Sequence, residues 1–189
     1  MVLNIPILLG TTRPNNKSSL VARYVNSITT EIDGVETFIV DPKEFNFPLD
    51  GKDEQVKDPR YTKITAQADA FFVVTPEYNH SFPGTLKRML DSELKNYIHK
   101  PVAVAGVSSG IFGGARVIEQ LAPVFRELGL VYTFSDVHFP EVDKLFNKKG
   151  NFIGDEQLYR KLINTAFEEL VWMAKVLKYG RESLENRYH

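Results

Sequence analysis

The amino-acid sequence predicts a single α/β domain over residues 1–189, built on a doubly wound sheet of five parallel strands with helices on both faces. Three observations support this fold class. Short apolar runs alternate with amphipathic segments five times, each run is stopped by turn residues, and no repeat, low-complexity tract or linker interrupts the order. Strands connected in this way are parallel, with right-handed crossovers.

The predicted strands are short and almost wholly apolar, as strands that are covered on both faces usually are. The first run, VLNIPILL, ends at Gly10, and Pro6 within it removes one donor from the sheet. The third run, FFVVT, ends at Pro76. The five strands are predicted at residues 2–9, 35–40, 71–75, 102–107 and 130–134.

Helices are predicted where apolar residues recur at three- and four-residue spacing. Gly129 and Gly180 follow two of these segments and are expected to end them. Residues 41–60 are polar and contain proline, which predicts a long loop. The helices are predicted at residues 18–32, 64–70, 85–97, 115–128 and 158–179.

Composition narrows the functional classes. The chain has 189 residues, of which 43% are hydrophobic and 25% charged. Its formal net charge is −1, so the overall charge provides no electrostatic attraction to nucleic acid or to an anionic membrane. Because there is no cysteine, a disulfide scaffold, a thiolate metal site and a cysteine nucleophile are excluded. The first apolar run is too short to span a bilayer. These features predict a cytoplasmic protein.

Ligands of doubly wound sheets bind beyond the carboxyl ends of the strands. The first such loop, 10–19, combines hydroxyls and cations at the start of a helix, where free N–H groups favour a phosphate. It lacks the second glycine of a Walker loop and the Gly-x-Gly-x-x-Gly dinucleotide pattern, so a mononucleotide is the better match. The alternative is that Asn16 or Ser18 simply caps the helix.

Two more loops follow the third and fourth strands. Loop 75–84 contains two prolines, and its rings Tyr78 and Phe82 can face a flat heterocycle; the alternative is a purely structural turn. Loop 108–114 is rich in glycine, so its N–H groups can approach an anionic ligand closely, and left-handed conformations are expected there, at Gly110 among others. The alternative is helix capping.

Taken together, the three loops resemble those of the NADPH-dependent FMN reductase family, which includes azoreductases and quinone or chromate reductases. The family pattern Gly-Ser-x-Arg is matched by Gly10-Thr11-Thr12-Arg13. Residues 76–87 match Pro-Glu-Tyr-Asn-x-Ser-x-Pro-Gly-x-Leu-Lys at every stated position. The third family pattern is Ser-x-Gly-x-x-Gly-Gly-x-Arg/x-Ala followed by Gln-Leu. Residues 108–116, with Gln120-Leu121 after them, match it. The resemblance spans the chain and implies a flavodoxin-like FMN-binding domain.

The resemblance also implies which residues hold FMN. The phosphate would be bound by Thr11, Arg13, Lys17 and Ser18. The ribityl chain and the ring would be lined by Pro76, Glu77, Tyr78 and Asn79. The pyrimidine edge would meet Ser108, Ser109, Gly110 and Gly113. NADPH or NADH would supply hydride, and quinones, azo compounds, metal ions or free flavin would accept the electrons in a ping-pong cycle.

Two departures from the family pattern stand out. Thr11 replaces the usual serine, and Ser92 stands where many members carry tryptophan. The resemblance further implies a homodimer or homotetramer, and the wide apolar face of the last helix fits an interface. The alternative is that this helix simply packs on the sheet.

Other functional interpretations are weaker. The four histidines, His80, His99, His138 and His189, are too scattered for a metal site, and no Gly-x-Ser-x-Gly elbow marks a nucleophilic serine. No side-chain acid or base is predicted to be catalytic. Trp172 is assigned to the core or a dimer contact, and the run 144–149 to a solvated loop. The rival functions are an FMN-binding electron carrier or redox-sensing module, and an apo interaction domain.

Overall fold

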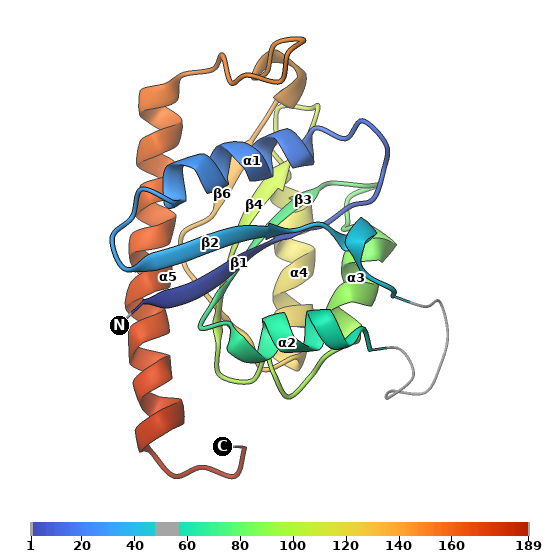
Figure 1. Cartoon of the computed structure of the whole chain (residues 1–189). Helices are drawn as coiled ribbons and strands as arrows, with labels where there is room; N and C mark the ends of the chain where they lie inside the picture. Colours follow the sequence, from blue (N-terminus) through green and yellow to red (C-terminus); the bar gives the residue numbers. More distant parts are fainter. Residues whose placement is uncertain (1, 48–56, 189) are drawn as a thin grey trace.

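The central strands pair in the order β2-β1-β3-β4-β5, and every pairing is parallel. The computed structural model describes residues 2–47 and 57–188 (Figure 1). The strands are β1 (Leu3–Leu9), β2 (Val35–Val40), β3 (Phe71–Pro76), β4 (Pro101–Val107), β5 (Val131–Tyr132) and β6 (Val137–Phe139). The order reverses between β1 and β3, which confirms the doubly wound sheet.

The helices divide between the two faces of the sheet (Figure 1). α1 (Ser18–Thr29) and α5 (Glu156–Ser183) cover one face, and α2 (Pro59–Gln67), α3 (Gly84–Asp91) and α4 (Ala115–Glu127) cover the other. Successive strand residues alternate between them: Phe72 packs with the first pair, while Phe71 and Val73 pack with the other three helices. This two-sided burial explains why the strands read as unbroken apolar runs.

Several helix boundaries differ from prediction. The loop expected over 41–60 contains a short 3₁₀ helix, Pro42–Glu44, and ends where α2 begins at Pro59; its part at 48–56 lies outside the described residues. α2 starts five residues before the predicted position because Asp58 accepts the Arg60 N–H at its N-terminus and Pro59 occupies the first turn. α1 ends at Thr29, not at Ile32, and α3 ends at Asp91, not at Tyr97.

The predicted fifth strand, 130–134, is reduced to β5 at Val131–Tyr132, and a separate strand that was not predicted, β6, follows at Val137–Phe139. Both β5 and β6 pair with β4, β5 at its beginning and β6 at its end. Between them the Glu169 carboxylate of α5 accepts the N–H groups of Phe134 and Ser135, at 2.6 and 2.9 Å. The side chain of Phe134 is 93% exposed. The prediction was wrong here because a helix carboxylate, far away in sequence, replaces the strand partner.

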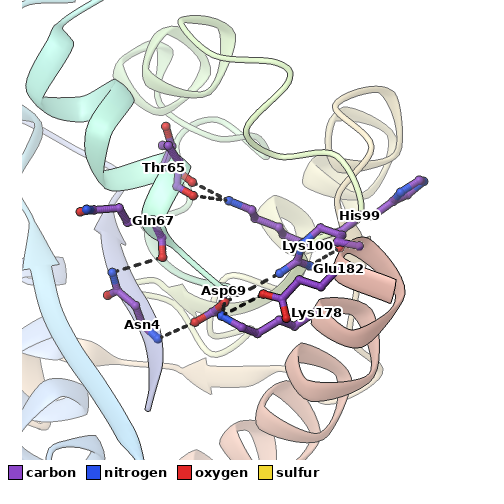
Figure 2. A network of polar contacts seen from close by, with 10 residues as sticks. Asn4, Thr65, Gln67, Asp69, His99, Lys100, Lys178 and Glu182 are labelled. Carbon is purple, nitrogen blue, oxygen red and sulfur yellow. Dashed lines mark hydrogen bonds and ion pairs between the residues drawn. The ribbon is translucent and has the colours of Figure 1, made fainter. Parts of the chain in front are cut away.

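Glycine ends one predicted helix but not the other. Gly129 follows α4 with φ of +74° and donates to the Arg126 carbonyl, which confirms it as the left-handed cap. α5 continues through Gly180 to Ser183, because side chains of its last turns bond to the segments that precede β3 and β4. Lys178 Nζ lies 2.6 Å from Asp69 Oδ1, and Arg181 donates to the His99 carbonyl (Figure 2).

Lys100 belongs to the same polar network, at the edge of the sheet opposite the three loops. Its ammonium group is buried and donates to the carbonyls of Thr65 and Ala66 at the end of α2, at 2.7 and 3.2 Å (Figure 2). Burial, together with the neighbouring positive charge of Arg181, lowers the pKa of Lys100 to about 8. An unfolded lysine titrates near a pKa of about 10.4.

This difference predicts a pH-dependent stability. Between pH 8 and 10 the unfolded chain binds the Lys100 proton more tightly than the native chain, so the free energy of unfolding rises with pH, by up to about 1.4 kcal/mol per unit. Urea unfolding at pH 7, 8, 9 and 10 should show this rise in the wild type and lose it in Lys100→Met. The exposed control Lys161→Met should keep it. If the free energy of unfolding depends on pH in the same way in all three proteins, the pKa of Lys100 is an ordinary one.

Candidate functional site

A cleft of about 400 Å³ opens at the carboxyl edge of the sheet, beyond β1 and β3, where the strand order reverses. The three predicted loops form it: residues 10–17 after β1, 77–83 after β3 and 108–114 after β4. Its described lining residues are Arg13, Pro14, Asn15, Asn16, Lys17, Ser18, Pro76, Glu77, Tyr78, Val107, Ser108, Ser109, Val142 and Asp143. The fold therefore brings together segments that are far apart in the sequence.

The first loop reaches the N-terminus of α1 in a compact turn. The Asn16 side chain donates to the Arg13 carbonyl and accepts the Ser19 N–H, at 2.7 and 2.8 Å, so Asn16 is the capping residue that the sequence left open. Ser18 and Lys17 line the cleft next to this cap. Lys17 Nζ lies 3.6 Å from Asp143, and both side chains are well exposed, which makes this a weak ion pair.

Thr11 lies beneath the loop, not on its surface. Its side chain is 1% exposed, accepts the Arg13 N–H at 3.2 Å and is hydrogen-bonded to the Tyr78 hydroxyl at 3.1 Å. The Arg13 guanidinium lies 5.9 Å from the centre of the Tyr78 ring. These contacts connect the first loop to the second and leave the charge of Arg13 at the surface.

The second loop is a tight two-residue turn. Tyr78 and Ser81 exchange backbone hydrogen bonds at 2.8 and 3.0 Å, and the two residues between them, Asn79 and His80, both have positive φ, 50° and 66°. Positive φ at both central positions is the mark of a type I′ turn. Asn79 is therefore exposed at the tip, and Phe82 packs into the core beside α2, α3 and α4, away from the cleft lining.

Glu77 lies between the second loop and α4. Its side chain is 10% exposed, and Oε1 lies 2.9 Å from Arg116 Nη1. The Arg116 guanidinium in turn lies 4.7 Å from the centre of the exposed Phe112 ring. Glu77 Oε2 is buried and has no hydrogen-bond partner among the described residues, although Glu77 lines the cleft. A buried carboxylate oxygen of this kind is expected to accept a donor from a bound ligand.

The third loop is held open by glycines at its base. A Cβ on Gly114 would lie 2.7 Å from Gly106 Cα, and Gly113 and Gly114 both have positive φ, 58° and 80°. The expectation that Gly110 is left-handed was wrong, since the positive-φ glycines of this loop are Gly113 and Gly114, and a Cβ on Gly110 would meet nothing within 4 Å. Gly110 instead offers its carbonyl to Ser108 Oγ and to the Glu141 N–H.

The predicted site residues thus fall into two groups. Arg13, Lys17, Ser18, Pro76, Glu77, Tyr78, Ser108 and Ser109 line one cleft, whereas Thr11, Asn79, Gly110 and Gly113 shape its loops. The sequence reasoning missed Asp143 and Val142, which return to the cleft after β6, and it gave Arg116 no role. The position of Arg116 inside the third motif was the available signal.

Residues set aside in the sequence can now be located. Ser92 is buried and donates to the carbonyl of Met89, and Trp172 is 65% exposed on α5, so it is not a core residue. In the run 144–149 the lysines are exposed but Phe146 is buried. His189 lies outside the described residues, and within the described ones no group of three potential metal ligands occurs. None of the described helices has the length and apolar character of a membrane span.

Solved structures share this fold. The NAD(P)H:(acceptor) oxidoreductase FerB of Paracoccus denitrificans aligns with a TM-score of 0.73 at 20% identity, over 92% of this chain and 98% of that one. A mutant flavodoxin from Pseudomonas aeruginosa aligns with a TM-score of 0.52 at 17% identity, over 93% of this chain and 99% of that one. At these identities the likeness shows a flavodoxin-like fold.

Sequence comparisons identify the family. The NADPH azoreductase of Bacillus sp. (strain OY1-2) is 28% identical over 96% of this chain and 98% of that protein. The quinone reductase of Escherichia coli (strain K12) is 34% identical, but the match covers 60% of this chain and 64% of that protein, somewhat less than two thirds. The model of the NADPH-dependent FMN reductase family matches residues 3–143. The chain therefore belongs to the NADPH-dependent FMN reductase family and is an oxidoreductase that uses FMN and NAD(P)H.

Proposed function

We propose that this chain holds one FMN in the cleft, without covalent attachment, and passes electrons from NAD(P)H to small acceptors such as quinones, azo compounds, metal ions or free flavin. The observation that carries the proposal is the convergence of cations, an N-terminal helix turn and a buried acceptor oxygen on one cleft of about 400 Å³. The absence of cysteine supports a reducing, cytoplasmic location.

The residues of the cleft fit FMN at both of its ends. Arg13, Lys17 and Ser18 supply charge and a hydroxyl beside the N-terminus of α1, the combination that holds a phosphate. Elsewhere in the cleft, Glu77 Oε2 has no hydrogen-bond partner among the described residues, and a ribityl hydroxyl or a ring N–H would supply the donor. Thr11, Asn79, Gly110 and Gly113 keep the loops in the shape that this binding requires.

Bound FMN supplies the hydride and electron chemistry, and the chain supplies position and charge. Arg116 fixes the Glu77 carboxylate, and the second and third loops form the walls beside it. Ser108 and Ser109 offer hydroxyls at the third-loop wall. No described side chain of the cleft is needed as an acid or base in this scheme.

The test of this function is anaerobic. The purified protein should be yellow, release about one FMN per chain on heating, and lose its visible absorbance when NADPH or NADH is added. Because one cleft receives the reductant and the acceptor in turn, double-reciprocal plots at several quinone concentrations should be parallel, as in other two-step enzymes. Release of FAD would refute the cofactor assignment. Intersecting lines together with no bleaching by either nucleotide would leave an electron carrier as the function.

We also propose that the chain forms a homodimer, or a homotetramer built from it, through α5. Part of the apolar face predicted for this helix is used inside the monomer, where Ile163, Phe167, Leu170 and Ala174 are buried. Another set remains exposed: Leu158, Leu162, Trp172, Val176 and Tyr179. Trp172 lines a groove of about 440 Å³ whose other residues are Ile32, Phe167 and Val171 together with the polar Asn164, Glu168 and Lys175. A face of this kind supports a contact with a second copy.

Replacing Trp172 tests the dimer. Light scattering at micromolar protein should give at least a dimer for the wild type and a smaller species for Trp172→Glu, because a buried interface does not accommodate an unpaired carboxylate. FMN content and the far-ultraviolet spectrum should stay unchanged. The substitution Glu168→Gln, which removes a charge from the same groove, serves as the control. A fully FMN-loaded wild-type monomer would contradict the proposal.

A further inference from the structure

A second cavity, of about 300 Å³, also has a residue of the first loop in its wall. Thr12 lines this cavity, and the next residue, Arg13, lines the cleft. The Thr12 hydroxyl lies 3.3 Å from the Thr85 hydroxyl at the start of α3. The described walls are completed by the segment after β2, so that the lining residues are Thr12, Pro42, Phe45, Phe47, Thr85 and Arg88.

The walls combine flat aromatic surface with one cation. The rings of Phe45 and Phe47 lie 6.0 Å apart, and both pack edgewise on buried Tyr61, which holds them in position. Arg88 is the charged residue among the described lining residues, and its Nη1 donates to the Phe47 carbonyl at 3.3 Å. A guanidinium has five N–H donors, and among the described residues the others of Arg88 have no hydrogen-bond acceptor. The nearby Arg60 is paired with Asp58, at 2.7 Å, and its guanidinium lies 5.1 Å from the centre of the Phe45 ring.

These groups are the kind that recognises a phosphorylated purine nucleoside. Bases stack on phenyl rings, and a guanidinium binds a phosphate dianion through paired hydrogen bonds. FMN carries one phosphate and is accommodated by the cleft itself, so the second cavity is left for another molecule. A dinucleotide that delivers hydride in the cleft has a second nucleotide, joined through a pyrophosphate, which must lie close by.

We propose that this cavity binds the adenosine end of NADPH, with the adenine against Phe45 and Phe47 and the 2′-phosphate on Arg88. The inference rests on the proposed function and adds the structural basis of its nucleotide preference. In this arrangement the connecting pyrophosphate would pass the hydroxyls of Thr12 and Thr85, which lie 3.3 Å apart. Because NADH lacks the 2′-phosphate, Arg88 favours NADPH over NADH.

Adenosine 2′,5′-bisphosphate tests the cavity without any hydride chemistry. Calorimetric titration into the FMN-loaded wild type should give binding that Arg88→Gln weakens at least about tenfold, the loss expected for a hydrogen bond to a charged group. Arg88→Lys should recover part of the affinity. Lys87→Gln, on the same helix but paired with Asp91, is the matched control and should bind like the wild type. Adenosine 5′-phosphate should bind more weakly and be insensitive to Arg88.

Steady-state kinetics separate this inference from the proposed function. Arg88→Gln should raise KM for NADPH about tenfold while KM for NADH and FMN affinity stay as in the wild type, and Phe45→Ala should raise both KM values. If neither nucleotide reduces the wild type, the proposed function fails. The calorimetric titration with the bisphosphate still tests whether the cavity binds an adenosine nucleotide. Equal bisphosphate affinity and equal KM for NADPH in wild type, Arg88→Gln and Arg88→Lys would overturn the adenosine site.

Discussion

Arg13→Ala should weaken FMN binding by about 1.5–3 kcal/mol, or roughly 10- to 150-fold in Kd. The guanidinium lies at the surface of the first loop, beside the N-terminus of α1, and faces the cleft where a phosphate would bind. Riboflavin, which lacks the phosphate, should bind wild type and variant about equally. Quenching of flavin fluorescence on binding measures both affinities.

Arg23 provides the matched control for this result. It is exposed on the α1 helix and does not line the cleft, so Arg23→Ala should leave both flavin affinities unchanged. Because Arg13 also lies over the Tyr78 ring, the alternative explanation of a loss of affinity is a purely structural role. Equal losses for FMN and riboflavin would identify that role and remove the phosphate contact.

Gly114→Val should destabilise the protein by at least about 3 kcal/mol, because two costs add. A β-branched residue is strained at φ of +80°, and its Cβ would lie 2.7 Å from Gly106 Cα. Gly110→Val has neither cost, because Gly110 is not a positive-φ glycine and its Cβ would meet nothing within 4 Å. The free energy of unfolding of this variant should lie within about 0.5 kcal/mol of that of the wild type. Urea unfolding of the two apoproteins measures the contrast.

The tolerance of Gly110 makes it the sharper probe of function. A valine there would crowd whatever approaches the third loop while the fold stays intact. Stopped-flow reduction by NADPH should slow several-fold in Gly110→Val and the flavin potential should fall, with oxidised FMN bound nearly as in the wild type. A variant with unchanged reduction rate and potential would show that the third loop does not contact the reacting ring.

The positions of most strands and most of the cleft could be predicted because they depend on local patterns. Apolar runs, helical periodicity and loop motifs are written in neighbouring residues, and Asn16, Gly129 and the loop after β3 behave as their types suggest. The start of α2 could also have been predicted, since Asp58-Pro59 is a strong signal for a helix N-terminus that the prediction overlooked.

Other failures have a different cause, which is a partner distant in sequence. Glu169 of α5 interrupts the fifth strand, and the contacts of Lys178 and Arg181 carry α5 past Gly180. In the site, Arg116 reaches back to Glu77, and Asp143 joins Lys17. Such pairs follow from the folded arrangement, and apart from the place of Arg116 in the third motif, local sequence patterns do not indicate them.

The interrupted fifth strand has a further consequence for solubility. It forms the outer margin of the sheet beyond β4, and an uncovered strand margin is a template on which foreign chains add and aggregate. Here a continuous row of free N–H groups never forms, because the Glu169 carboxylate occupies those of Phe134 and Ser135 midway along the margin. We therefore expect this one acidic side chain of α5 to disfavour the addition of a foreign strand at the margin.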